Sequence, residues 1–418
     1  MEKPETCHII IPGDVRHQLD WLRDSPEGQA ILQSLHPRQK QKRLRCACQE
    51  PPQQQAQMVI RHRDSSYHIA RMPDTGHHHV RGQCDFYSER ASSDRNGGGE
   101  YVKAIIHHDD VTDIKINFPL RKATPPDQDR VKTTSSSGKG RTQRDSLGLG
   151  GLLSHLWNEA AINTWNGGQG RRWEQLLRDL KTVAAGTTLG QRKLLDHLYL
   201  QPAASEAWLP PAPADVAQSR DMVLLLFKVS ASHTTQYGSV YLKTSKGGSL
   251  FVKKPVMDAL MRSYPQVRAE FALRAAREHA PLDRGPQVIC LALAQWASIG
   301  KTATLVIQQA ALMLASWRYI PVESSHELRI ADLLVQQRRT FTKPMRYDAD
   351  ADVVFPDFIL SDTGGDGTPM EVYGVNGSPV YEARKQEKRQ HYLQCGAAFW
   401  EWTPASQAEP PPFPASQR

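Results

Sequence analysis

The stretch that most constrains this chain is a pair of short strands, each carrying one acid, joined by a glycine-rich turn. VVFPDFIL is apolar and rich in β-branched and aromatic residues, which predicts a buried strand containing Asp357. SDTGGDGT has the composition of a turn, and MEVYGV predicts a second short strand with Glu371 near its start. Because strands joined by so short a loop pair as a hairpin, we expect Asp357 and Glu371 to lie side by side.

Two adjacent carboxylates repel unless one is protonated or a cation lies between them. A hard divalent ion such as Mg²⁺ takes oxygen ligands of this kind, and it lowers the pKa of bound water and neutralises phosphate charge. A structural role is the alternative for each acid alone: Asp357 follows Pro356 and could cap a strand, and Glu371 could face solvent. An acid inside an apolar strand is costly without a partner, which favours the metal interpretation for the pair.

Two predicted helices flank the acidic strands. Ser324-Ser325-His326-Glu327 has the form of a capping box, so Glu327 could simply tie off a helix start. In the second helix, Tyr381, Lys385, Lys388 and Tyr392 fall on one face. A solvated basic face is one interpretation of that pattern, and a face that contacts phosphate is the other.

The order PDF, turn, EVYG and basic helix, after a helix that carries Glu, resembles the PD-(D/E)XK, or restriction-endonuclease-like, nuclease superfamily. The resemblance implies that Asp357 and Glu371 hold Mg²⁺ and that Glu327 assists. In that superfamily a lysine two residues after the Glu supports the attacking water, but Tyr373 occupies this position here. Either Lys385 or Lys388 then supplies the cation from the helix, or the site has lost cleavage.

A cluster of thiols and imidazoles lies near the N-terminus. RLRCACQ contributes Cys46 and Cys48, and TGHHHVRGQCDFY contributes a histidine triplet and Cys84. These are the ligand types that zinc prefers, and four suffice for a closed tetrahedral structural site. We expect Cys46, Cys48, His79 and Cys84 to bind Zn²⁺, with His77 or His78 as alternatives to His79. The competing interpretation is a set of unrelated buried thiols beside a polar loop.

The combination of C-x-C, YHIARMPDTGHHH, C-x-F-Y and the IPVESSHE…FTKP…PDF…EVYG tail is similar to an uncharacterised family of bacterial proteins, the domain of unknown function 1173. Its members are carried on conjugative plasmids and integrating elements. The resemblance implies a mobile-element setting in the bacterial cytoplasm, with conjugation or mobile-element proteins as partners.

Composition points to a polyanionic partner. The chain has 418 residues and a formal net charge of +8, which suits DNA. It shows no signal-peptide pattern and no apolar run of about 20 residues, so we expect a cytoplasmic protein without a membrane partner. Six scattered cysteines do not form a disulfide framework.

Periodicity and linker composition predict a mixed α/β, or α+β, fold. LGQRKLLDHLYL is expected to be the third helix of the middle segment. The expected units are an N-terminal β-rich zinc module (1–121), a disordered basic linker (122–146), a helical segment (147–201), a proline-rich linker (202–217), a mixed α/β region (218–310), a restriction-endonuclease-like core (311–405) and a disordered tail (406–418).

These inferences lead to a Mg²⁺-dependent DNA endonuclease, in which Asp357 and Glu371 hold the ion and Lys385 or Lys388 neutralises developing charge. The alternative is a catalytically inactive nuclease-like accessory protein that binds DNA or a partner of the transfer machinery. A scaffold that contacts only proteins is a third possibility, and it predicts no affinity for DNA even at low salt.

Overall fold

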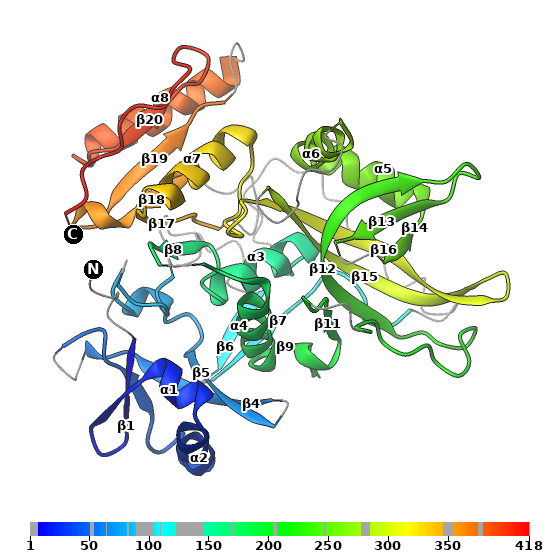
Figure 1. Ribbon diagram of the computed structural model, residues 1–418, viewed down its shortest axis with the longest axis horizontal. Coiled ribbons are helices and arrows are strands. Elements are labelled where there is room, and N and C mark those ends of the chain that lie inside the picture. The colour runs from blue at the N-terminus through cyan, green and yellow to red at the C-terminus, as the bar shows by residue number, and fades with distance from the viewer. Residues whose placement is uncertain are drawn as a thin grey trace.

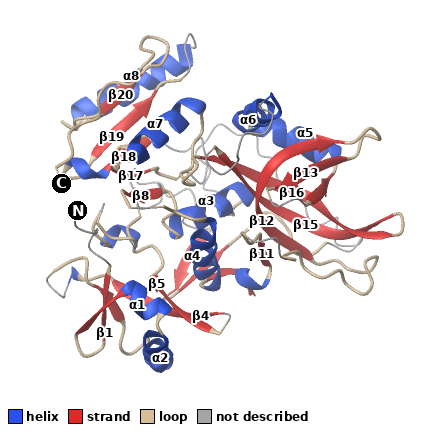
Figure 2. Cartoon of the chain, viewed as in Figure 1, coloured by secondary structure: helices blue, strands red, loops and turns tan. Residues whose placement is uncertain are grey.

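We describe the protein from a computed structural model (Figures 1 and 2). The described residues are 7–50, 54–63, 65–81, 83–88, 104–108, 110–122, 146–168, 170–203, 207–245, 248–276, 285–345, 355–374 and 379–417. They form a mixed α/β fold with eight α-helices and four sheets. None of the helices within these ranges is long and apolar enough to cross a membrane.

The N-terminal unit is a five-stranded antiparallel sheet with two short helices. Its strand order is β2-β1-β3-β4-β5. The strands are β1 (His8–Ile11), β2 (Val15–Gln18), β3 (Leu44–Cys46), β4 (Gln57–Arg63) and β5 (Ser66–Arg71), and the helices are α1 (Leu19–Asp24) and α2 (Pro26–Leu35). Ile9, Leu22, Leu32 and Ile60 form its separate core.

The middle of the chain supplies two helices and a small sheet. The helices are α3 (Leu149–Glu159) and α4 (Trp173–Ala185). The sheet has the order β10-β9-β7-β6 and is built from β6 (Ile105–His108), β7 (Val111–Ile114), β9 (Thr187–Leu189) and β10 (Arg192–Lys193).

A six-stranded sheet occupies the right of Figure 1. Its strands are β11 (Leu198–Leu200), β12 (Met222–Thr234), β13 (Val240–Thr244), β14 (Ser249–Val252), β15 (Gln287–Ile299) and β16 (Thr302–Ala315). Helices α5 (Lys254–Ser263) and α6 (Pro265–Ala276) connect β14 to β15. Strand β12 is buried on both faces: Leu225 and Phe227 belong to one core, and Leu224 and Leu226 pack with α3 and α4 in another. The continuous apolar run MVLLLF reflects this double burial.

The C-terminal unit follows the order helix, three strands, helix and strand. Its elements are α7 (Ser325–Gln336), β17 (Thr340–Thr342), β18 (Phe358–Leu360), β19 (Thr368–Val372), α8 (Pro379–Gln394) and β20 (Trp400–Trp402). The sheet order is β20-β19-β18-β17-β8, with β19 and β20 parallel and the other neighbours antiparallel. Its last strand, β8 (Thr164–Asn166), comes from the segment that was expected to be helical.

Two sequence expectations need correction. The expected third helix is instead the β9–β10 hairpin, a short 3-10 turn and β11, because Gly190 adopts a positive φ that turns the chain back. The expected disordered tail is wrong for residues 406–417, which lie along the C-terminal unit. There the Arg339 guanidinium donates to Pro414 O (2.8 Å), and Gln417 N donates to Asp362 O (2.8 Å).

Other expectations fall partly outside the described residues. Residues 123–145 of the predicted basic linker lie outside the described residues, as do the first two residues of the strand predicted over 353–360. The predicted boundary between 310 and 311 falls inside β16.

A buried ion pair fastens the turn between β18 and β19. Arg339 donates two hydrogen bonds to the Asp362 carboxylate (2.9 and 2.7 Å), and Thr340 N donates a third (3.0 Å). Removing one partner of a buried pair leaves an uncompensated charge. We therefore expect Asp362→Ala to lower the free energy of unfolding by about 3 kcal/mol, measured by urea denaturation. Asp366→Ala, at an exposed position of the same turn, should change it little, and equal losses for the two variants would contradict this account.

Candidate functional site

Four N-terminal side chains converge on one point. Cys46 ends β3 and Cys48 follows it, while His79 and Cys84 lie on the segment after β5. Cys46, His79 and Cys84 are buried and Cys48 is half-buried. Because β3 lies at the middle of its sheet, its end delivers the two thiols beside the histidine segment.

The distances within this group match those of a tetrahedral site. The Sγ atoms of Cys46 and Cys84 lie 3.6 Å apart, and His79 Nδ1 lies 3.4 Å from Cys84 Sγ and 3.6 Å from Cys48 Sγ. Zinc bonded at about 2.3 Å to sulfur and about 2.0–2.1 Å to nitrogen sets S···S edges of about 3.8 Å and S···N edges of about 3.6 Å. The cluster of Cys46, Cys48, His79 and Cys84 could therefore bind a metal such as zinc.

The other histidines of the triplet do not join this cluster. His78 is exposed and its ring packs edge-on against His77 at 4.1 Å. The structure thus brings His79, and not its neighbours, to the three thiols.

Sequence reasoning missed a fourth thiol near this group, Cys7. The neighbouring thiols of Cys48, Cys7 and Cys84 hold the pKa of Cys46 well below its usual range. The β1–β3 pairing, in which Ile9 lies opposite Cys46, brings Cys7 close. The only sequence signal was the apolar strand HIII directly after Cys7.

The second group is the carboxylate cluster, defined as Glu327, Asp357 and Glu371. Phe358 pairs with Met370, and Asp357 N donates to Met370 O (2.9 Å), so the antiparallel register sets Asp357 opposite Glu371. Side chains directly opposite in such a pair lie on the same face of the sheet. The Asp357 carboxylate also accepts from Val372 N (2.7 Å).

Glu371 is fully buried, and both of its oxygens are hydrogen-bonded. Lys388 Nζ lies 2.6 Å from Oε2, and the Tyr392 hydroxyl donates to Oε1 (2.7 Å). Both partners come from α8. Burial raises the pKa of Glu371 to about 7, and the nearby Asp357 charge adds to this.

Glu327 is the third member and comes from α7. Ser324 caps this helix by accepting from Glu327 N (3.1 Å), but the Glu327 carboxylate does not complete the predicted capping box. Its Oε2 accepts from Glu323 N (3.0 Å) and from Lys343 Nζ (2.8 Å). Burial raises the pKa of Glu327 to about 7, against the pull of Lys343 and with a further push from Asp357. Asp357 thus acts electrostatically on both glutamates.

The two lysines that the sequence offers as alternatives have different partners. Lys388 reaches Glu371, whereas Lys385 donates to Thr403 Oγ1 (3.1 Å) and lies over the Tyr373 ring at 4.6 Å. Lys343, which sequence reasoning missed, is buried against Glu327, and the only signal for it was a lysine in the apolar run TFTKPM. Among the described residues, the ligand atoms of the three acids do not approach one another as closely as those of the Cys/His cluster, which lie within 4.8 Å.

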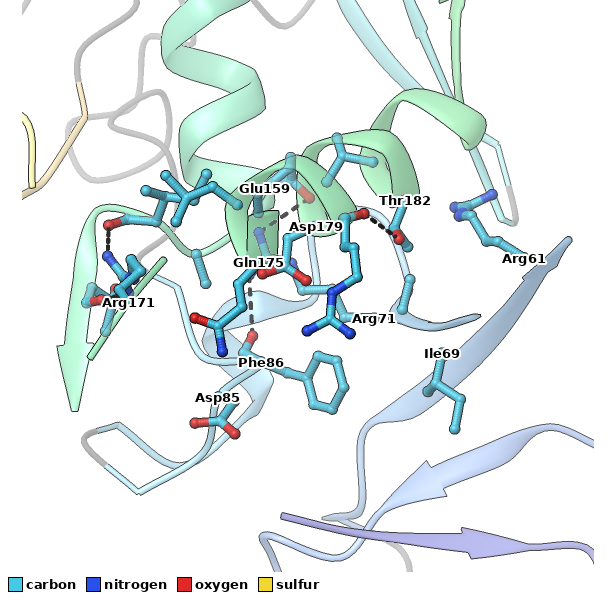
Figure 3. Close-up of a pocket in the computed structure, with 18 of the residues that line it drawn as sticks. Arg61, Ile69, Arg71, Asp85, Phe86, Glu159, Arg171, Gln175, Asp179 and Thr182 are labelled. Carbon is cyan, nitrogen blue, oxygen red and sulfur yellow. Dashed lines mark hydrogen bonds and ion pairs between the residues drawn. The ribbon is translucent and has the colours of Figure 1, made fainter. Parts of the chain in front are cut away.

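A cavity of about 410 Å³ lies where β5, α3 and α4 meet (Figure 3), and none of the three acids lines it. Arg71 crosses it to pair with Glu159 (3.2 Å) and to donate to Phe86 O (3.1 Å). Arg71 also donates to Asn158 O (2.9 Å), so it ties the segment after β5 to α3. The wall of the cavity carries five arginines and four acids, so their charges nearly cancel. These residues are Arg23, Arg61, Arg71, Arg171, Arg178, Asp20, Asp85, Glu159 and Asp179.

These features define a mixed α/β protein with a possible Cys/His metal site near its N-terminus. The chain belongs to the family described as "Protein of unknown function (DUF1173)", whose model matches residues 18–405. No curated protein and no solved structure matches the chain.

We expect the purified protein to contain one zinc ion per chain, measured by elemental analysis. Cys84→Ser and His79→Ala should each lose the metal, because a tetrahedral site lacking one ligand binds much more weakly. His78→Ala is the matched control and should retain it. Metal loss from His78→Ala with retention by His79→Ala would contradict the ligand assignment.

Proposed function

We propose that the protein is a Mg²⁺-dependent DNA endonuclease whose reaction centre is the carboxylate cluster of the C-terminal unit. The observation that carries the proposal is the apposition of Asp357 and Glu371, with Lys388 2.6 Å from Glu371. Glu327 on the first helix, Asp357 before the second strand and Glu371 in the third strand also follow the order of acids in the PD-(D/E)XK resemblance. The mobile-element setting is proposed from the family resemblance alone.

The donor set suits a hard cation. Asp357 and Glu371 present carboxylate oxygens on one face, and the pKa of Glu371 is raised by burial and by Asp357, so added positive charge would stabilise the ionised pair. When bound there, Mg²⁺ would supply a water of lowered pKa and would neutralise charge on the phosphate. Lys388 would hold Glu371 in place and place its ammonium where charge develops on the phosphate. Glu327, held by Lys343, would add a further acceptor beside Asp357.

Tyr373 occupies the position of the motif lysine, and Lys388 is a better candidate than Lys385 to supply the missing cation. The Lys388 ammonium contacts Glu371 Oε2 and also donates to Phe355 O (2.8 Å), two residues before Asp357. The Lys385 ammonium is engaged by Thr403 and the Tyr373 ring.

Asp357→Ala and Glu371→Ala should abolish nicking of supercoiled plasmid DNA in Mg²⁺, because each removes a carboxylate that would hold the ion. Agarose-gel conversion of supercoiled to open-circular plasmid measures this, with EDTA as the metal-free control. Asp366→Ala should nick like the wild type. Wild-type cutting by both of the other variants would reject these ligands.

Lys388→Met and Lys385→Met should differ. We expect Lys388→Met to reduce the nicking rate by at least about 100-fold, as does removal of a single group that stabilises developing charge. Lys385→Met should remain within a few-fold of the wild type. Because Lys388→Met leaves Glu371 buried without its cation, thermal unfolding must be followed in parallel, and Glu387→Ala on the exposed side of α8 is the helix control. A larger loss of nicking rate in Lys385→Met than in Lys388→Met would contradict the assignment of this role to Lys388.

A catalytically inactive DNA-binding accessory protein is the second candidate. The observations in its favour are Tyr373 at the lysine position and the two lysine–glutamate pairs, in which ammonium groups already neutralise Glu327 and Glu371. This function predicts DNA binding that does not depend on metal and no nicking in either Mg²⁺ or Mn²⁺.

A further inference from the structure

The strands β12, β13, β14, β16 and β15 form a closed ring of pairings. Strand β12 pairs with β13 and with β15, β13 pairs with β14, β14 pairs in parallel with β16, and β16 pairs with β15. The helices α5 and α6 connect the third and fourth of these strands in chain order, β14 and β15. A five-stranded ring with this connectivity has the topology of an OB-fold, which binds oligonucleotides on its second and third strands and the loops after its first and fourth strands.

The outer face of the ring is covered on one side and open on the other. Over β12 and β15 the outward side chains, such as Leu224 and Leu291, pack with α3 and α4. The second and third strands, β13 and β14, lie on the side of the molecule away from the N-terminal sheet (Figure 1). There Val240, Leu242, Leu250 and Val252 point into the core, and the alternate residues point outward.

The open face carries aromatic rings. Tyr241 and Phe251 are paired across β13 and β14, both are half-buried, and their ring centroids lie 5.5 Å apart. Tyr237, in the turn between β12 and β13, is 86% exposed. Aromatic side chains at a water-facing surface are poorly accounted for by packing, but they suit stacking with bases.

The strands of the ring and the turns between them carry lysines and no acids. Residues 222–257 contain five lysines and no Asp or Glu, and residues 287–315 contain one lysine and no Asp or Glu. Lys243 is exposed on β13, two residues after Tyr241. Lys253 comes directly after β14 and donates to Gln308 Oε1 (3.2 Å), and Lys301 is exposed in the turn between β15 and β16. The sheet face therefore combines exposed ammonium groups with aromatic rings and lacks anionic groups within its strands.

We propose that the outer face of β13 and β14, with the turns at Tyr237 and Lys301, binds single-stranded DNA. Bases would stack on Tyr241 and Phe251, and Lys243, Lys253 and Lys301 would contact the phosphates. A duplex would fit less well, because its bases are already stacked and their faces are not available to the rings. This surface is separate from the carboxylate cluster, and the proposal does not depend on nuclease activity.

The test is fluorescence anisotropy with a labelled oligothymidine of about 16 nucleotides, the upper site size of one OB-fold. The measurement uses the full chain in EDTA, so that cleavage plays no part. We expect Phe251→Ala and Tyr241→Ala each to weaken binding about tenfold, as for loss of one stacked base. Lys243→Ala should lower the salt slope of log K by about 0.7, the value for one phosphate contact on a single strand. Lys243→Glu, at an exposed position, should weaken binding further without affecting the fold.

Matched controls are Trp21→Ala and Lys42→Ala, which remove an exposed tryptophan and an exposed lysine from the N-terminal unit. Both should bind like the wild type, and the EDTA in the buffer separates this measurement from the nuclease proposal. The assignment would be overturned if the Phe251, Tyr241 and Lys243 variants all bound within twofold of the wild type. Tighter binding of a duplex, or of an oligouridine of the same length, would overturn the choice of single-stranded DNA.

Discussion

The C-terminal unit depends on how a fully buried carboxylate is neutralised. Glu371 has no exposed surface, and an unpaired charge there would be prohibitively costly. Lys388 and Tyr392 from α8 supply one hydrogen bond to each oxygen, which fixes the helix against the β19 strand. Lys343 donates a hydrogen bond to Oε2 of the buried Glu327 (2.8 Å). The unit thus contains two buried lysine–glutamate pairs, and the proposed hydrolysis would use the same groups.

Local patterns in the sequence were sufficient for much of this unit. The apolar run before the glycine-rich turn, the strand MEVYGV and the Ser324 cap each depend on residues close in the chain, and the structure places β18, β19 and α7 there. The Cys/His cluster was also accessible, because its residue types and spacing restrict the chemistry, and the structure brings the four side chains together.

What the sequence could not provide is pairing between distant segments. Nothing in Thr164–Asn166 indicates that it completes a sheet whose other strands begin at Thr340. Cys7 and Lys343 were overlooked because their partners become neighbours only through the β1–β3 and α7–β17 contacts. The helical period of LGQRKLLDHLYL was misleading, since a glycine with positive φ decides the conformation of its first half. In these places tertiary structure overrides the local preference.

The +8 charge is not spread evenly. The wall of the cavity beside Arg71 nearly balances arginines against acids, whereas the strands of the closed ring contain lysines and no acids. Net charge alone therefore indicated a polyanionic partner without locating it. Its uneven distribution directs attention to β13 and β14, which are far in sequence from the acids that first drew notice.

The C-terminal sheet includes β8, which comes from the middle of the chain, and this limits which fragments can contain the complete sheet. The Thr164 and Thr342 hydroxyls are hydrogen-bonded to each other (3.2 Å). Asn163 Nδ2 donates to Lys343 O (2.8 Å), and Lys343 N donates to Asn163 O (2.8 Å). A fragment that begins after the closed ring would contain the whole carboxylate cluster but not β8. The backbone hydrogen-bonding groups on one edge of β17 would then be unpaired, which favours edge-to-edge association of strands. A piece that retains the whole sheet must therefore begin before Thr164, the first residue of β8.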